Sequence, residues 1–412
     1  MLLSRKIVAL FILFAMTSFS LTGQETTVDV KYKRSSLHTI MITDDTREHS
    51  ETIRDIFINA PLIDKFNNHM VDMRLVPKAD ALSGQVETDE DKSSKHKEIL
   101  SYLNTNDLAK SIVAKWFNRS ETGGFNMDLV AERGHYNATD LDVKIANNSE
   151  RGAALLSDAG EALIQNTFVI VNDFKYTNKE EVAKKTNSIL SKVSSIASRV
   201  GDGHTVQLAN ASSESVEFLG KGYIIKTKAH LFKLVWNEET AAIFYNNFWT
   251  DDNNLDPEKK KAFDDTDVFK LEYIGTEISW ADLQSTKLTT KTNEELIGIA
   301  TIKAIDNVIA KLQRTHEVFR TKTPLIGVDP LAAKIGLKEG LEKGDKYEVL
   351  EQVLNENGIV EYQRLGIIKV DKDHIWDNRY NAEEENPSPI TYTTFSGGKK
   401  KYFAGMLIRQ IN

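Results

Sequence analysis

Cysteine is absent from all 412 residues of the chain. A zinc site built on thiolates, an iron–sulfur cluster, a thiol nucleophile and a disulfide framework are therefore excluded. The absence fits an exported bacterial protein that folds without disulfide catalysis, and it would be unusual in a secreted eukaryotic chain of this size.

The motifs of several large enzyme classes are also missing. The sequence contains no Gly-x-Ser-x-Gly elbow, no Gly-x-x-x-x-Gly-Lys-Ser/Thr loop and no Gly-x-Gly-x-x-Gly turn, so nothing indicates a serine-hydrolase elbow, a P-loop or a dinucleotide site. Its nine histidines never occur as His-x-x-x-His, the spacing that places two zinc ligands on one helix face. We therefore predict no cofactor and no metal site.

Long apolar runs are missing except near the start. Arg5 and Lys6 precede an apolar run over 7–16, and small polar residues follow to Gly23, a pattern typical of a secretion signal. We expect cleavage between Ser20 and Gln24. The run is shorter than the ~20 residues of a spanning helix, and a lipid-anchored signal would need a cysteine. We therefore predict a soluble protein, without a transmembrane helix, exported to the periplasm or cell surface of a Gram-negative bacterium.

Positive charge is scarce relative to negative charge. The formal net charge is −8, and it becomes −10 without Arg5 and Lys6. The densest basic runs, 259–261 and 399–401, are short and neighbour acidic stretches, whereas a phosphate-binding surface needs a concentrated basic patch. We predict that nucleic acid is not a partner.

What is present indicates an α+β protein of two or three domains. Charged residues make up 27% and hydrophobic residues 41% of the chain, which is globular composition. Strand and helix patterns alternate over 37–200, as in helices layered on a sheet. The predicted parts are a signal peptide (1–23), a flexible leader (24–36), an α/β domain (37–205), a β-rich section (206–323) with a packing helix (294–312), and a small β-barrel or sandwich module (324–412).

Four segments carry most of this interpretation. The run 167–171 carries apolar residues on both faces of the pleat, which predicts a central strand buried on both sides. The stretch 125–132 is also predicted as a strand, and 222–249 as a β-hairpin around the turn-like 237–239. Short apolar segments punctuated by glycine after Pro324 predict the barrel or sandwich.

The first candidate site is the acidic group after the predicted strand 37–43. Asp44, Glu48 and His49 combine carboxylates and an imidazole at the end of a strand, where α/β proteins commonly place their sites. These residues are candidates for acid–base catalysis. They are equally ordinary in a turn that leads into a helix, because acidic side chains stabilise the positive end of the helix dipole.

The second candidate site is aromatic. Trp236, Tyr245 and Trp249 lie in the predicted hairpin and could line a groove for a sugar or peptide, because flat rings stack on apolar faces. Alternate residues of a strand point the same way, so core packing is the simpler interpretation for half of such a set.

The C-terminal part resembles a known kind of module. The stretch Ala333-Lys334-Ile335-Gly336-Leu337-Lys338-Glu339-Gly340 and the later Arg364-Leu365-Gly366-Ile367-Ile368 look like the entry into small barrel modules of curli-export and flagellar-assembly envelope proteins. More broadly, the chain is similar to uncharacterised exported proteins of Gram-negative bacteria. The resemblance implies a barrel and an envelope location. Curli-export lipoproteins begin with an acylated cysteine, which this sequence lacks, so a membrane-pore function is not implied.

These observations favour an exported envelope protein for binding or for assembly, acting as a scaffold without identifiable catalysis. Its expected partners are other cell-envelope proteins or a surface glycan. The alternative is a secreted hydrolase that depends on carboxylates near Asp44.

Overall fold

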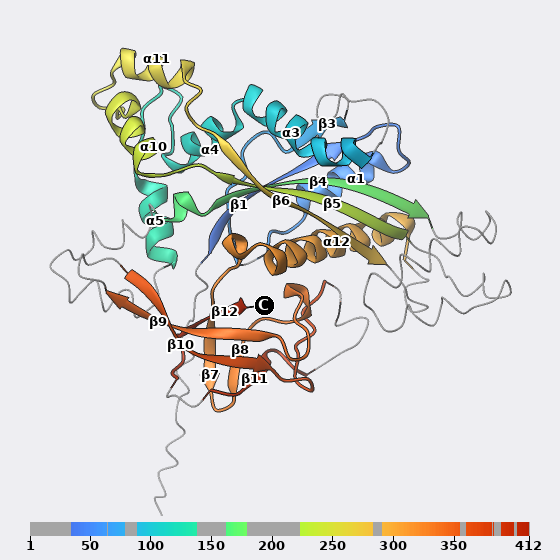
Figure 1. The fold of residues 1–412 in the computed structure, drawn as a ribbon. Coiled ribbons are helices and arrows are strands. Elements are labelled where there is room, and N and C mark those ends of the chain that lie inside the picture. Colours follow the sequence, from blue (N-terminus) through green and yellow to red (C-terminus); the bar gives the residue numbers. More distant parts are fainter. Residues whose placement is uncertain are drawn as a thin grey trace, which may run out of the picture.

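A mixed sheet and a small closed barrel form the two units of the computed structural model (Figure 1). The structure describes residues 34–63, 65–78, 89–137, 162–178, 223–282, 291–354, 360–380, 382, 389–398 and 402–411. The predicted signal peptide (1–23) and nearly all of the predicted leader (24–36) lie outside these residues. The α+β fold class is confirmed.

The sheet has the strand order β2-β1-β4-β5-β6, and β3 also pairs with β1. Strand β1 runs parallel to β2, β3 and β4, whereas β5 runs antiparallel to both of its neighbours, β4 and β6. The strands are β1 (Ser35–Thr43), β2 (Phe66–Asn68), β3 (Leu75–Pro77), β4 (Thr167–Asn178), β5 (Tyr223–Leu234) and β6 (Leu271–Asp282). Strands β5 and β6 fall in the predicted section 206–323, so the division predicted at residue 205 does not separate two sheets.

Helices cover both faces of this sheet (Figure 1). One face carries α3 (Asp89–Thr105), α4 (Leu108–Trp116), α5 (Asp128–Asn137), α10 (Glu238–Ile243), the π-helix η4 (Phe244–Phe248) and α11 (Pro257–Asp265). The other face carries α1 (Ser50–Asn59), α12 (Asn293–Thr315) and the short η6 (Glu317–Phe319).

Strand β4 confirms the predicted central strand. Phe168 and Ile170 pack with the α12 side of the sheet, while Val169 and Val171 pack with the α4 side. All four side chains are buried. A strand covered on both faces has no solvent side, so its sequence is apolar throughout.

The predicted hairpin over 222–249 is wrong after its first strand. Asn237 begins helix α10, because its side-chain Oδ1 accepts a hydrogen bond of 2.8 Å from the Thr240 amide. Glu238 and Glu239 occupy the first helical turn, where negative charge is stabilised by the helix dipole. The polar triplet that predicted a turn between strands is a helix start.

The predicted strand 125–132 is also wrong, since helix α5 begins at Asp128. Asn126 Oδ1 accepts a hydrogen bond of 3.0 Å from the Asp128 amide and so satisfies one of the amides at the start of the helix. Helix α12 contains the whole of the predicted helix 294–312.

The C-terminal unit is a closed barrel in the order β10-β11-β8-β7-β12-β9. Its elements are β7 (Thr323–Val328), β8 (Leu331–Ala333), the 3-10 helix η7 (Leu337–Glu339), β9 (Lys346–Leu354), β10 (Val360–Val370), β11 (Thr393–Ser396) and β12 (Leu407–Ile411). The barrel lies on the α12 side of the sheet (Figure 1). Gly340, with a φ of 72°, brings its backbone so close to α12 that a Cβ there would lie 3.1 Å from the Ala310 Cβ.

Candidate functional site

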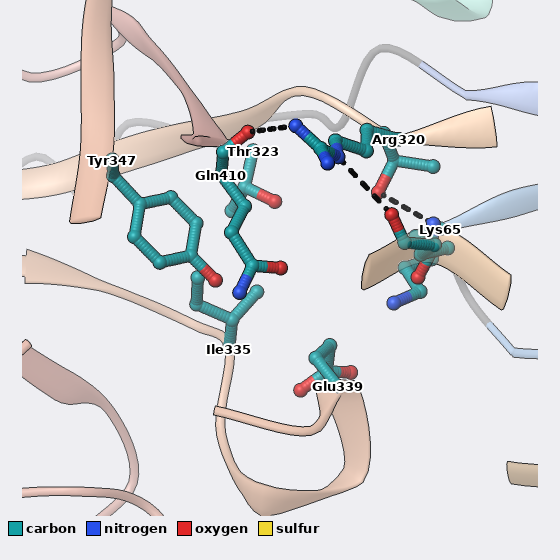
Figure 2. Close-up of a pocket in the computed structure, with 9 residues that line it drawn as sticks. Lys65, Arg320, Thr323, Ile335, Glu339, Tyr347 and Gln410 are labelled. Carbon is teal, nitrogen blue, oxygen red and sulfur yellow. Dashed lines mark hydrogen bonds between the residues drawn. The ribbon is translucent and has the colours of Figure 1, made fainter. Parts of the chain in front are cut away.

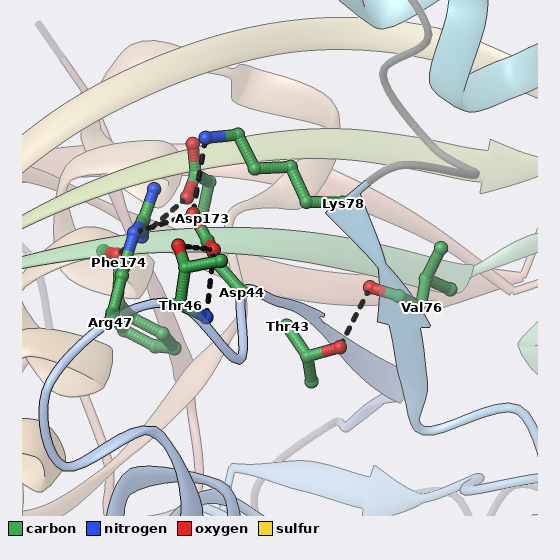
Figure 3. A network of polar contacts seen from close by, with 8 residues as sticks. All are labelled: Thr43, Asp44, Thr46, Arg47, Val76, Lys78, Asp173 and Phe174. Atoms are coloured by element: carbon green, nitrogen blue, oxygen red, sulfur yellow. Dashed lines mark hydrogen bonds and ion pairs between the residues drawn. The ribbon is translucent and has the colours of Figure 1, made fainter.

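Asp44 lies at the carboxyl end of β1, inside a ring of positive and hydroxyl groups (Figure 3). Its Oδ1 accepts a hydrogen bond of 2.6 Å from Thr46 Oγ1, and its Oδ2 lies 3.0 Å from Arg47 Nε and 3.2 Å from Lys78 Nζ. The hydrogen bond from Thr46, assisted by Lys78 and Arg47, lowers the pKa of Asp44 to about 2.

Arg47 connects this cluster to strand β4. Its guanidinium Nη1 lies 3.3 Å from Asp173 Oδ1 and also donates to the Phe174 carbonyl oxygen, both in β4. Lys78 follows β3 directly. Asp44 and Arg47 therefore join the ends of β1 and β3 to the middle of β4.

His49 has different partners from Asp44. Its Nε2 lies 3.2 Å from the Tyr223 hydroxyl and 3.3 Å from Glu48 Oε1, and Glu48 is largely exposed. A general base works best with a pKa near the working pH, whereas Asp44 is held ionised far below neutrality. The geometry of these three predicted residues favours a structural clamp over a catalytic constellation.

The aromatic candidates belong to one packed cluster. Trp236 is buried, and Tyr245 and Trp249 are partly buried against the same core. The Phe244 ring lies within 6 Å of Trp236, Tyr245 and Trp249, with ring-centroid separations of 5.7, 5.3 and 5.9 Å. Edge-to-face packing at these distances is typical of an aromatic core.

A cavity of about 30 Å³ lies between the sheet unit and the barrel (Figure 2). It receives side chains from the segment before β2, from the connection between α12 and β7, and from η7, β9 and β12. The polar residues of its wall are Lys65, Gln313, Arg320, Thr321, Thr323, Glu339, Tyr347 and Gln410.

Lys65 is the unusual member of this wall. Its side chain is only 4% exposed, and within the described part of the chain its ammonium has no hydrogen bond and no ion pair. Burial lowers the pKa of Lys65, although the negative charges of Glu339 and Asp306 oppose this. Removing an ammonium group from water costs several kcal/mol unless a counter-charge compensates. The fold tolerates this cost at Lys65.

Two other polar groups face the cavity without a partner among the described residues: the hydroxyl of Tyr347, and Oε1 of Glu339. The second Glu339 oxygen, Oε2, already has partners, because it accepts hydrogen bonds of 2.6 Å from the Gly336 amide and 2.8 Å from Asn378 Nδ2. Burial raises the pKa of Tyr347, so its hydroxyl stays protonated and able to donate.

Arg320 fixes the wall by binding backbone. It donates to the carbonyl oxygens of Gln313 at 3.2 Å and Arg314 at 2.9 Å, both in the last turns of α12, and to that of Gln410 at 3.1 Å in β12. A cation at a helix C-terminus is favourable because the terminal carbonyls lack helical partners. Arg320 thereby ties the helix to the barrel across the edge of the cavity.

A second charged pair adjoins the cavity. Asp306 on α12 is buried, and its Oδ2 lies 3.8 Å from Lys338 Nζ on η7. Burial raises the pKa of Asp306 to about 6, despite the nearby positive charge of Lys338.

One feature of the sequence near Lys65 points to this cavity. Lys65 directly precedes Phe66 and follows Ile63 by two positions, both of them buried, and a lysine close to buried apolar residues is itself rarely buried. The other residues of the wall lie about 250 or more positions further along the chain, so no local pattern connects them to Lys65.

The described residues also bear on metal binding and on membrane-spanning helices. In the ranges that the structure describes, no group of three or more histidine, aspartate or glutamate side chains is arranged to hold a metal ion. None of the helices described there is long and apolar enough to cross a bilayer.

Comparison with known proteins identifies no relative, so a functional assignment has to rest on the chemistry of these residues. No family model matches the chain, and no curated protein matches it at a significant level.

Proposed function

We propose that this chain is an exported binding protein of the Gram-negative cell envelope and that the cavity between its sheet and its barrel holds a small ligand. The observation that carries the proposal is Lys65, a buried ammonium group without a partner in the described part of the chain, which faces an opening. Ligand sites often lie where two units meet and use a few convergent polar groups.

The architecture supports a site at this place. The wall combines Lys65 from the sheet unit with Glu339, Tyr347 and Gln410 from the barrel. A ligand there contacts both units, and no rearrangement of either hydrophobic core is needed to admit it, because the cavity is already formed.

The experiment compares what the protein retains when it is purified from an envelope extract. Gln410→Phe fills the cavity, and Gln363→Phe places the same ring on an exposed position of β10. Small molecules released by denaturation are identified by mass spectrometry. We expect wild type and Gln363→Phe to release a compound that Gln410→Phe lacks. Identical extracts from all three proteins contradict the proposal.

An assembly role has separate support on the barrel. Val328, Ile367 and Phe403 are 43, 42 and 47% exposed. Val328 ends β7 and Phe403 precedes β12, which pairs with β7 in antiparallel order, so both lie toward the same end of this strand pair. Exposed apolar side chains in proximity are typical of interaction surfaces.

The partner we propose for this surface is another cell-envelope protein, with a surface glycan as the alternative. A photo-crosslinker at Phe403 is expected to give one discrete adduct in envelope extract, and one at Leu255, exposed on the sheet unit, to give none. Equal labelling from both positions, together with a strictly monomeric protein in size-exclusion chromatography, contradicts the assembly role.

Export is part of the same proposal. It is supported by the charged and then apolar start of the chain, with Arg5 and Lys6 before the run 7–16. Cell fractionation with N-terminal sequencing tests it: we expect a chain that begins between residues 21 and 24 outside the cytosol. An intact leader on cytosolic protein contradicts export.

A further inference from the structure

The cavity that we propose as a ligand site has charge of both signs on its wall. The Lys65 ammonium comes from the sheet unit and the Glu339 carboxylate from η7 of the barrel, and Figure 2 shows both residues around the same space. They do not neutralise each other directly, since no ion pair within 4.0 Å joins them. A group placed between them meets a positive donor on one side and a negative acceptor on the other.

The cavity wall also offers both hydrogen-bond donors and hydrogen-bond acceptors. Across the cavity from Lys65 (Figure 2), the Tyr347 hydroxyl is available to donate, whereas Glu339 Oε1 can only accept when it is ionised. A bound anion alone would satisfy Lys65 and Tyr347 but would be repelled by Glu339. A bound cation alone would satisfy Glu339 but would be repelled by Lys65.

The size of the cavity limits the group that enters. The centre of a water-sized sphere can occupy about 30 Å³ of this cavity, more than the ~10–15 Å³ that one water molecule needs by the same measure, so a head group of a few non-hydrogen atoms fits within the wall. The remainder must project through the opening to solvent.

From this layout, and resting on the proposed binding function, we infer that the cavity takes the head group of a small zwitterionic α-amino acid. The carboxylate accepts hydrogen bonds from Lys65 and Tyr347, and the ammonium group, one carbon away, donates to Glu339 Oε1. Each charge then contacts its opposite directly, which lowers the cost of burying Lys65 without an ion pair or hydrogen bond. The side chain of the amino acid lies toward the opening.

The test uses four small probes of matched size, measured by saturation-transfer NMR with wild-type protein near neutral pH. Glycine carries both charges, glycolate replaces the ammonium by a hydroxyl, acetate carries only the carboxylate, and methylammonium only the cation. We expect glycine to bind most tightly and glycolate and acetate about tenfold or more weakly, because these two lose the charge-assisted hydrogen bond to Glu339. Methylammonium should not bind measurably, because it loses the bonds to both Lys65 and Tyr347.

Two variants assign the two charges. Lys65→Met is expected to abolish binding of all carboxylate probes. Glu339→Gln retains an oxygen to accept from Gly336 and is expected to remove the preference for glycine over glycolate while glycolate still binds. The matched control is Lys369→Met, which removes an exposed lysine of β10 and should change no affinity.

The outcomes separate the ligand class from the binding function. If acetate binds as tightly as glycine and Glu339→Gln has no effect, the cavity is a simple anion site and the amino-acid assignment is wrong. If no probe binds but Gln410→Phe still loses a retained compound, the assignment is wrong and the binding function stands. If neither occurs, both fail.

Discussion

At the scale of single residues, Lys65 lowers the stability of the empty protein while providing the positive charge that we propose for ligand binding. Its ammonium is buried without a partner among the described residues, so Lys65→Met should stabilise the empty protein. We expect the free energy of unfolding to rise by about 1–3 kcal/mol, because a buried charge that makes no direct ion pair or hydrogen bond among the described residues is replaced by an apolar chain of similar length.

Urea unfolding of the ligand-free protein measures this effect. Lys369→Met, which alters an exposed lysine, should change the stability by no more than ~0.5 kcal/mol. A Lys65→Met protein that unfolds more easily than wild type shows that the ammonium makes a stabilising contact, which is incompatible with its role as an unpartnered group.

Asp306 makes stability depend on pH in the opposite direction from an ordinary surface carboxylate. Burial raises its pKa from 3.8 to about 6, with Lys338, Glu339 and Lys65 as the charged groups around it. The folded state therefore binds a proton that the unfolded state has lost, so this contribution is full below pH 3.8 and is lost as the pH rises through 6. The loss amounts to about 3 kcal/mol.

Asp306→Asn removes that dependence. The variant should be more stable than wild type at pH 7.5 and differ much less at pH 4, and the difference between their unfolding free energies isolates Asp306 from other titrating groups. A constant difference across this range would mean that Asp306 ionises with its ordinary pKa in the folded protein.

Sequence patterns predicted the position of the polar residue Asp44 in the fold, but they did not predict its interaction partners. Asp44 was correctly singled out at the end of a strand, but Lys78 and Asp173, which complete its network, lie 34 and 129 residues further along the chain. Only the sheet pairing of β1 with β3 and β4 brings them together. The charge that neutralises a carboxylate is therefore invisible in its local sequence.

At the scale of elements, helix α12 depends on a reciprocal cap at its start. Thr292 Oγ1 accepts a hydrogen bond of 3.2 Å from the Glu295 amide, and Glu295 Oε2 accepts one of 2.7 Å from the Thr292 amide. Thr292→Ala removes the first of these bonds and should lower the unfolding free energy by about 1 kcal/mol.

Thr292→Ser is the matched control, since it keeps the hydroxyl and should retain nearly all of the stability. Hydrogen exchange should report the difference in the first turn of α12. Equal destabilisation by alanine and serine would assign the loss to the threonine methyl group instead of the cap.

Elements with a single strong pattern were predictable, whereas those defined by a cap were not. The 3–4 spacing of Ile302, Ile305 and Ile309 predicted α12, and the unbroken apolar run predicted β4. Helices α5 and α10 were missed because side-chain hydrogen bonds at Asn126 and Asn237 start them, and strand-like apolar spacing concealed these starts.

At the scale of the whole molecule, the sequence predicted the kinds of unit but not their contact. The barrel follows from short glycine-punctuated strands. Its position beside α12 depends on Gly340, which allows close approach to Ala310, and on Arg314, whose guanidinium donates to Asp345 at 3.2 and 3.0 Å. These pairings join residues about 30 positions apart on different units, so the cavity between the units was not predictable.

Arg314 should therefore control how firmly the barrel is held. It lies on α12, forms two parallel bonds with Asp345, and also donates to the Gly340 carbonyl oxygen. Arg314→Met removes this clamp, and Arg314→Lys keeps a charge without the planar fork. We expect a loss of about 1–2 kcal/mol for methionine and an intermediate loss for lysine.

The part of the protein that loses stability in Arg314→Met shows whether Arg314 joins the two units or stabilises the whole fold. Amide exchange should accelerate in β9 and β12 of the barrel and stay slow in β4, because the clamp joins the units and contributes nothing to the central strand. Arg54→Met, at an exposed pair on α1, should leave both patterns unchanged. Uniform acceleration across sheet and barrel would show that the two units unfold as one, in which case a ligand in the cavity cannot act by fastening one unit to the other.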